Sequence, residues 1–266
     1  MDRTYWHKQT ADQPLFPDLL WSRPENKRHA GKLLIIGGNL YGFAAPAAAY
    51  QTAVAAGIGT VKVLLPDCLR KTFGQHLDAA EFAPSTPSGS FSQLSLDSWL
   101  DLAVWANGVL IAGDLGRNSE TAVVLESFLR SYRGPVTLTK DAVDYVTGNP
   151  RIVVARPDTT LVLSIAQLQK LAKAAGSPKA VTFSMDLLQL VDFLHNFTSD
   201  HAINIIVKHL DNIFVAVDGE VSTTKLPADA PAIWRVRTAA AAIVWSVQHS
   251  QNPLAAMTTS IAHRDI

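Results

Sequence analysis

The sequence predicts an α/β domain with a central, mostly parallel β-sheet and helices on both of its faces. Short apolar runs without polar alternation, the pattern of strands buried on both faces, recur along the chain. Most of them are followed by a glycine or serine turn and then by apolar residues at helical spacing. The 266 residues suffice for one large domain, and the repeated alternation of strand and helix implies parallel pairing.

The first strand-turn-helix-strand unit spans residues 32–66. The apolar run 33–36 predicts a strand, the alanine-rich stretch 44–56 a helix, and residues 60–65 the next strand. A turn between a strand and a helix lies at the carboxyl end of a parallel sheet, where open α/β proteins bind ligands. The same glycines would also serve a tight turn without a ligand. The candidate pocket residues of this turn are Gly37, Gly38, Asn39 and Gly42.

The later part of the chain continues this alternation. Ser119 is placed to cap the helix that follows it, Ser164 leads into another helix, and Asp218-Gly219 predicts a hairpin turn. Residues 77–98, rich in proline and serine, form the most loop-like part of the chain. The other predicted strands are 108–112, 135–138, 160–163, 203–207, 213–217 and 220–223, and the later helices are 183–195, 230–247 and 254–263.

Residues 1–31 are expected to form an irregular arm in front of a single domain of residues 32–266. The arm holds Trp6, Phe16 and Trp21 among prolines and polar residues. We expect these aromatic side chains to pack on the body of the chain or on a sister subunit.

The composition excludes several classes of protein. Lys and Arg number 23, as do Asp and Glu, so no excess charge draws the whole molecule to nucleic acid or to an anionic membrane. The single cysteine, Cys68, excludes an internal disulfide and a cysteine-built zinc site, and the histidines lack metal-ligand spacing, so we expect no structural metal. No apolar run approaches the roughly 20 residues of a membrane helix, and the first residues lack a signal peptide, so we expect a soluble, cytoplasmic protein.

Two motifs flanking the first helix make the order of elements more specific. His29-Ala30-Gly31-Lys32 precedes the first strand and its glycine turn, and Gly57-Ile58-Gly59-Thr60-Val61 follows the helix. From about residue 27 to the carboxyl end, the chain thus resembles the ADP- or ATP-dependent NAD(P)H-hydrate dehydratases of the ribokinase-like superfamily. The resemblance implies a ribokinase-like fold, a homo-oligomer, a nucleotide or dinucleotide ligand and, for an active member, ADP or ATP with magnesium.

The chemistry that the resemblance implies is phosphoryl transfer to the hydroxyl group of hydrated NADH or NADPH, followed by elimination. It needs a carboxylate base and a glycine-rich helix start that holds the phosphate. The family places both in a Gly-Ser/Thr-Gly-Asp segment, but residues 234–240 of this chain contain neither the glycines nor the aspartate. Thr238 falls nearest the expected aspartate, and a hydroxyl group is no base near neutral pH without activation.

Four other segments of the family pattern have also changed in this chain. Residues 112–116 keep the last pair, Leu115-Gly116, of a Gly-Pro-Gly-Leu-Gly loop but carry Asp114 where a small residue is expected, and residues 164–167 keep nothing of a His-Pro-Gly-Glu stretch. The resemblance therefore leaves two further candidates: Asp141, which keeps one acid of an Asp-Ala-Asp-Ala-Leu segment, and Lys208, which keeps the lysine of a Lys-Gly pair.

Each of these candidates has a structural alternative. Asp141 is an acid in the cleft or a helix cap, and Lys208 meets a phosphate or solvent. Three roles are open for Arg235 and Arg237. They could clamp a phosphate in place of the missing amides, fill the vacated nucleotide site by pairing with an acid such as Asp114, or lie on a solvated helix face.

Two functional hypotheses follow. The first is a divergent, catalytically degenerate relative that binds a nucleotide, a dinucleotide or a protein partner. The alternative is an active NAD(P)H-hydrate dehydratase or related small-molecule kinase with relocated catalytic groups. Because changes at four separate segments are hard to explain by relocation, the residues favour the first. An open cleft faced by Asp141 or Asp114 would favour the enzyme, and a cleft filled by Trp234, Arg235 or Arg237 the degenerate relative.

Overall fold

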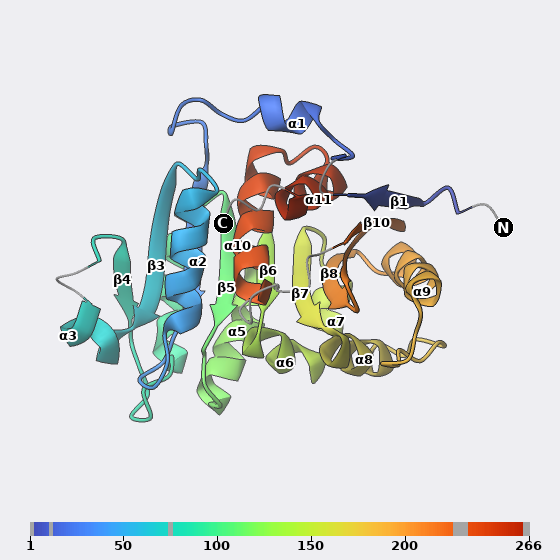
Figure 1. Ribbon diagram of the computed structural model, residues 1–266. Helices are drawn as coiled ribbons and strands as arrows, with labels where there is room; N and C mark the ends of the chain where they lie inside the picture. The colour runs from blue at the N-terminus through green and yellow to red at the C-terminus, as the bar shows by residue number, and fades with distance from the viewer. Residues whose placement is uncertain (1–2, 11–12, 74–76, 226–233, 263–266) are drawn as a thin grey trace.

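The computed structural model describes residues 3–10, 13–73, 77–225 and 234–262, which form one sheet with helices on both faces (Figure 1). The sheet has ten strands in the order β1-β10-β9-β8-β7-β6-β5-β2-β3-β4. The strands are β1 (Trp6–Gln9), β2 (Lys32–Gly37), β3 (Thr60–Pro66), β4 (Ala80–Ala83), β5 (Gly108–Gly113), β6 (Val136–Thr139), β7 (Thr159–Ser164), β8 (Ile203–His209), β9 (Asn212–Val217) and β10 (Glu220–Lys225). The helices are α1 (Asp18–Trp21), α2 (Ala44–Ala55), α3 (Arg70–Phe73), α4 (Leu96–Trp105), α5 (Ser119–Ser131), α6 (Asp141–Thr147), α7 (Arg151–Val154), α8 (Ile165–Ala174), α9 (Leu187–Asp200), α10 (Trp234–Gln248) and α11 (Pro253–Ala262).

Only β9 runs against the direction of its neighbours in this sheet of described residues. It pairs antiparallel with β8 and β10, whereas all other neighbouring strands are parallel. Antiparallel strands can be joined by short turns, and the β9–β10 turn is Asp218-Gly219, with φ of 49° and 82°. The predicted hairpin and the mostly parallel sheet are confirmed.

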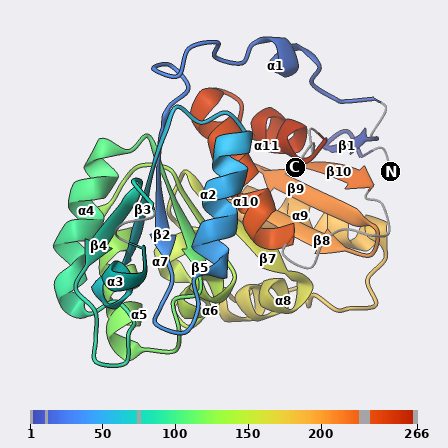
Figure 2. The ribbon, with the colours of Figure 1, turned by 60° about the vertical axis from the view of Figure 1, so that its left-hand side comes forward.

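The two faces of the sheet each bury an apolar layer, because alternate side chains of a strand point to opposite faces. Leu34 and Ile36 of β2 contribute to the core beneath α4 to α9, whereas Leu33 and Ile35 contribute to the core beneath α2, α10 and α11. Figure 2 shows α2 and α10 crossing on the same side of the strands. All four of these β2 side chains are fully buried, which explains the run of apolar residues without alternation.

The expectation of a loop over residues 77–98 is wrong in part. Residues 80–83 form β4, which pairs in parallel with the edge of β3, and α4 starts at Leu96. The exposed edge position explains why this strand lacks an apolar run: Glu81 of β4 pairs with Lys62 of β3 at 2.9 Å. Phe91 and Trp99 of the same region are both fully buried and pack edge to face, with ring centroids 5.1 Å apart.

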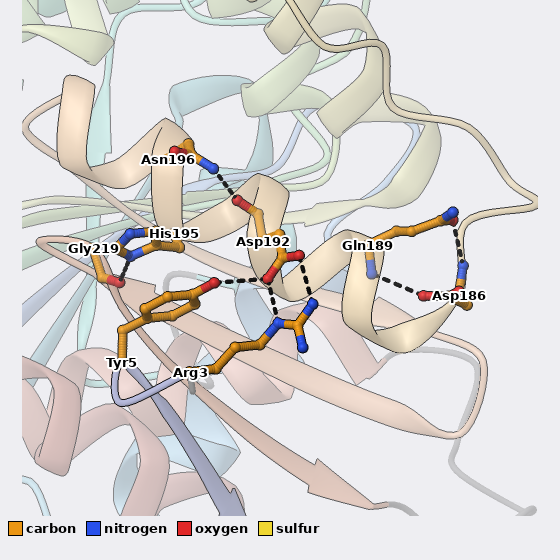
Figure 3. A network of polar contacts seen from close by, with 8 residues as sticks. All are labelled: Arg3, Tyr5, Asp186, Gln189, Asp192, His195, Asn196 and Gly219. Carbon is orange, nitrogen blue, oxygen red and sulfur yellow. Dashed lines mark hydrogen bonds and ion pairs between the residues drawn. The ribbon is translucent and has the colours of Figure 1, made fainter. Parts of the chain in front are cut away.

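The amino-terminal arm contributes a strand that the sequence did not indicate. Within the arm, β1 pairs in parallel with β10 at the sheet edge. Figure 3 shows how the residues before it reach α9: the Arg3 guanidinium donates to both carboxylate oxygens of Asp192 at 2.6 and 2.9 Å, and Tyr5 stacks on His195 with ring centroids 3.7 Å apart. These hydrogen bonds from Arg3 are the main reason why the pKa of Asp192 is lowered to about 2.

Helix starts are partly as predicted. A helix follows Ser164 as expected, and Ser164 caps it in a capping box with Gln167. The cap of α5 is Asn118 instead of Ser119, because the Asn118 side chain accepts the backbone N–H of Glu120 at 2.8 Å. The helix expected over 183–195 begins only at Leu187, and residues 230–233 and 263 of the last two predicted helices lie outside the described residues. Among the described residues, no helix has the length and apolar character to cross a membrane.

Candidate functional site

The candidate site lies at the carboxyl ends of β2, β5 and β6. These strands are neighbours in the sheet, so the loops that lead from them into α2, α5 and α6 meet at one edge. The polar side chains in these loops define what the site can bind.

Asn39 connects the first loop to the second. Its side-chain amide donates to the Asp114 carbonyl at 2.6 Å, and its side-chain oxygen accepts the N–H of Tyr41 at 2.8 Å. Its backbone N–H also donates to the Gly42 carbonyl at 2.8 Å, which closes the turn. Both ends of the Asn39 side chain are therefore used to shape the loops.

Asp114 joins all three loops through its carboxylate. One oxygen accepts the N–H of Ala45 in the first turn of α2 at 2.7 Å, where the helix dipole favours a negative charge. The other oxygen accepts a hydrogen bond from Lys140 Nζ. Because both oxygens are engaged and the side chain is only 16% exposed, Asp114 does not offer a free carboxylate to the cleft.

Asp141 is bound within the loop that follows β5. Its Oδ2 accepts the backbone N–H groups of Leu115 at 2.8 Å and Gly116 at 3.2 Å. Its Oδ1 is buried without a hydrogen-bond partner. Burial is the main reason why the pKa of Asp141 is raised, with the nearby charge of Asp114 adding to it. Asp141 is not the expected helix cap, because it is the first residue of α6 and Lys140 precedes it as the N-cap.

This contact determines what the loop can bind. Successive backbone N–H groups of a glycine-containing turn are an anion-binding arrangement. Here the chain's own Asp141 carboxylate already accepts two of them.

The backbone around these side chains is strained. Gly113, Asp114, Gly116 and Lys140 have φ of 97°, 57°, 77° and 54°, a region that costs a residue with a side chain about 1–3 kcal/mol. A Cβ at Gly113 would lie 2.7 Å from both Asp141 Oδ1 and Lys140 Cβ, so only glycine fits there. Such strain clusters at binding and catalytic sites, and here it accompanies the Asp114–Lys140 pair.

Arg235 extends the network to the start of α10. Its Nη1 donates to Gln167 Oε1 at 2.8 Å, and Gln167 Nε2 donates to the Lys140 carbonyl at 2.8 Å. Gln167 is only 5% exposed. Of the three roles expected for Arg235, this contact agrees best with filling of the vacated nucleotide site. The partner is the neutral side-chain amide of Gln167, however, and not an acid.

The other candidates on strands and helices lie outside this network. Thr238 is buried in α10, and Arg237 is half-buried without a hydrogen bond or ion pair to any described residue. Lys208 lies on β8 opposite Ser164 of β7, two strands from β6, and its side chain makes no hydrogen bond or ion pair within the described residues.

The candidate glycines differ in the structural reason for having glycine at each position. A Cβ at Gly37 would lie 2.5 Å from the Gly113 carbonyl, and Gly38 and Gly116 have φ of 87° and 77°. Strand packing and turn geometry therefore account for these three. Around Gly42 the nearest atoms are 3.9 Å from an added Cβ, which is an ordinary van der Waals contact, so neither packing nor turn geometry requires glycine there.

An apolar hollow adjoins the first loop and is lined by residues of α2, β3 and α3. It has a volume of about 370 Å³ and is lined by residues such as Phe43, Pro46, Tyr50, Leu65 and Phe73. Its lining residue Phe43 directly follows Gly42 of the first loop.

Sequence reasoning missed Lys140 and Gln167. Lys140 stands directly after an apolar strand and before Asp141, a position at a carboxyl end of the sheet that could have drawn attention to it. Gln167 gave no signal apart from its role in the capping box, because its contacts to Lys140 and Arg235 are distant in sequence.

The residues of this site do not fit magnesium. That ion prefers carboxylate and water oxygens, whereas the oxygens of Asp114 are both bonded and the unpaired oxygen of Asp141 is buried. Among the described residues, no group of three or more His, Cys, Asp or Glu side chains is arranged to hold a metal. The cationic group that adjoins this network, Arg235, fits an anionic group such as phosphate better.

Solved structures with similar folds include several ribokinase-like proteins. A ribokinase-like superfamily protein from Enterococcus faecalis matches with a TM-score of 0.73 and 13% identity over 98% of this chain and 87% of its own. A protein from Streptococcus mutans matches with a TM-score of 0.69 and 14% identity over 91% and 84% of the two chains. The ADP/ATP-dependent NAD(P)H-hydrate dehydratase from Bacillus subtilis, crystallised with ATP and Mg²⁺, matches with a TM-score of 0.62 and 14% identity over 94% and 86%.

These similarities confirm the predicted ribokinase-like α/β fold. No protein-family model matches the sequence. At 13–14% identity the structures establish the fold and leave the activity to be argued from the site.

Proposed function

We propose that this protein is a catalytically degenerate relative of the NAD(P)H-hydrate dehydratases that binds a nucleotide or dinucleotide. The observation that carries the proposal is the engagement of both cleft carboxylates. Asp114 is bonded to Lys140 and Ala45, and Asp141 to the amides of the loop after β5. A general base must reach the proton that it removes, and neither carboxylate is free to do so.

Ligand binding in this cleft would use its cations and its apolar hollow. Arg235 at the start of α10 has bidentate geometry available for a phosphate, and the hollow beside Phe43 offers a wall for an aromatic ring. A nucleotide combines both chemical features. We further propose that the protein forms a homo-oligomer, which sedimentation equilibrium would test.

An active dehydratase is the second candidate, and one observation favours it. Burial raises the pKa of Asp141, and a raised pKa is common among catalytic acids and bases. This candidate requires Asp141 to leave the amides of Leu115 and Gly116 when substrate binds.

Two measurements separate the candidates. Thermal-shift titration with ADP, ATP, NADH and NADPH tests binding, since a ligand at about 100 times its dissociation constant adds roughly 2.7 kcal/mol of stability. Incubation with hydrated NADH and either nucleotide, monitored by the return of reduced-nicotinamide absorbance, tests catalysis. We expect stabilisation by at least one of these ligands and no turnover. Turnover that is lost in Asp141→Asn would establish the enzyme instead, and no stabilisation by any of them would reject binding.

A matched pair of variants locates the binding site. Arg235→Ala should weaken binding about tenfold, because a charge-assisted hydrogen bond is removed. Lys170→Ala, which removes an exposed charge from α8, should leave binding unchanged. Equal affinities for the two variants would place the ligand elsewhere.

A further inference from the structure

A polar hollow lies at the amino ends of the strands, opposite to the cleft at their carboxyl ends. It has a volume of about 650 Å³, and its lining includes four arginines, Arg130, Arg133, Arg151 and Arg156, and no acidic residue. α5 starts at the cleft with its cap Asn118 and runs back along the sheet, so its final turn, which carries Arg130, lies near the amino end of β7. The two sites are therefore separate.

Little in the described chain neutralises these arginines. Arg130 pairs with Glu126 at 2.6 Å, and Glu126 also accepts a hydrogen bond from Asn149 at 3.1 Å. Arg133 and Arg151 are exposed and make no hydrogen bond or ion pair to any described residue. The formal net charge of the whole chain is zero, so this hollow concentrates positive charge that is balanced elsewhere.

Arg156 is the least expected of the four, because only 6% of its surface is exposed. Its Nη2 donates to the carbonyls of Tyr132 at 2.8 Å and Gly134 at 2.6 Å, and its Nη1 to the Thr159 hydroxyl at 2.7 Å and the Pro157 carbonyl at 3.3 Å, all neutral acceptors. Its Nε is buried without a partner. No carboxylate pairs with Arg156 among the described residues, although Asp158 is near enough to favour its charge.

A buried cation without an ionic partner is costly, and a bound anion would reduce that cost. The carbonyl contacts hold the Arg156 guanidinium in a fixed orientation at the base of the hollow, while the exposed arginines stand at its rim. The exposed guanidinium groups of Arg133 and Arg151 can bind phosphate oxygens in bidentate fashion, whereas Arg156, whose terminal N–H groups are used within the chain, contributes its charge. The volume lies within the roughly 300–1,000 Å³ of small-molecule sites.

We propose that this arginine hollow binds a polyphosphate, either inorganic or as the phosphate chain of a nucleotide. After allowance for Glu126 and Asp158, four arginines leave an excess of positive charge that matches a multiply charged anion better than a single carboxylate. The site is independent of the cleft and of the function proposed for it.

The test is isothermal titration of the full chain with inorganic tripolyphosphate. Arg133→Ala/Arg151→Ala removes two exposed charges from the rim and leaves the buried Arg156 in place, so folding should be retained. Arg28→Ala/Lys170→Ala removes the same charge from exposed positions outside both sites. Arg235→Ala reports on the cleft.

We expect tripolyphosphate to bind the hollow with an affinity about tenfold weaker for each rim arginine removed and unchanged in the Arg28→Ala/Lys170→Ala control, whereas Arg235→Ala should affect only binding at the cleft. ATP should compete for the same site if the natural ligand is a nucleotide, and should fail to compete if it is inorganic. The proposal is overturned by an absence of binding at millimolar tripolyphosphate, by equal weakening in the Arg28→Ala/Lys170→Ala control, or by loss of binding in Arg235→Ala alone.

Discussion

Replacing Asp141 with alanine should destabilise the protein and at the same time create an anion site. In the native protein the Asp141 carboxylate accepts the N–H groups of Leu115 and Gly116 at 2.8 and 3.2 Å. Without it, these two donors point towards an empty space at the carboxyl end of β5. A phosphate or sulfate ion could then take the place of the carboxylate.

The size of the effect follows from these contacts. A hydrogen bond to a charged group contributes about 1.5–3 kcal/mol, so two of them set an upper range of roughly 3–6 kcal/mol. Burial destabilises the ionised carboxylate, as its raised pKa indicates, and this offsets part of that sum. We therefore expect a loss of about 2 kcal/mol, which is roughly 4–8 °C in Tm for a chain of this size.

The assay is chemical denaturation with and without added phosphate, on Asp141→Ala and on Asp144→Ala. Asp144 lies on the same helix and is exposed, so its variant removes an equal charge without the loop contacts. Phosphate should stabilise Asp141→Ala and have little effect on the native protein or the control. If Asp141→Ala were as stable as Asp144→Ala and equally insensitive to phosphate, the carboxylate would not occupy an anion site.

Three further predictions concern the core, the strained loop and the arm. Trp99→Ala should cost about 3–5 kcal/mol in urea denaturation, because this fully buried side chain leaves a cavity. Gly113→Ala should cost more than 1 kcal/mol by the same assay, since its φ of 97° disfavours a side chain and the new Cβ would lie 2.7 Å from Lys140 Cβ. The arm should detach at low pH: the lowered pKa of Asp192 means that its ionised form stabilises the attachment above pH 3.8, and this contribution is lost as the pH falls towards about 2. Limited proteolysis with an acid-active protease would detect the released arm.

Each of these has a control and an outcome that contradicts it. Leu94→Ala, at a site 80% exposed, should cost far less than the tryptophan substitution, and similar losses would contradict the burial argument. Gly42→Ala should be tolerated because the nearest atoms lie 3.9 Å from its new Cβ, so equal losses at both glycines would remove the argument from strain. Asp192→Asn should release the arm at neutral pH, and an arm protected in this variant would show that the Arg3 contact does not hold it.

The sequence indicated most of the fold because buried strands carry a strong local signal. Leu33 to Ile36 form an apolar run that is fully buried between two helical layers, and the glycine turn after it is where expected. β4 and β1 escaped prediction because edge strands need no apolar run: β4 carries Glu81, and three of the four residues of β1 are polar, with His7 and Gln9 bonded to side chains of β10.

By itself, the sequence determined that the chain forms an α/β sheet and that the aspartate expected at the start of the last long helix is missing, with Thr238 near its place. Only the tertiary structure decided what the remaining acids do. Asp114 and Asp141 look alike as candidates in the sequence, but Lys140 and the amides of Leu115 and Gly116 occupy their oxygens. Such contacts join three loops separated by strands and helices, and no local pattern encodes which of them will meet. The arginine hollow arises in the same way, since the end of α5, α7 and the start of β7 come together only in the folded sheet.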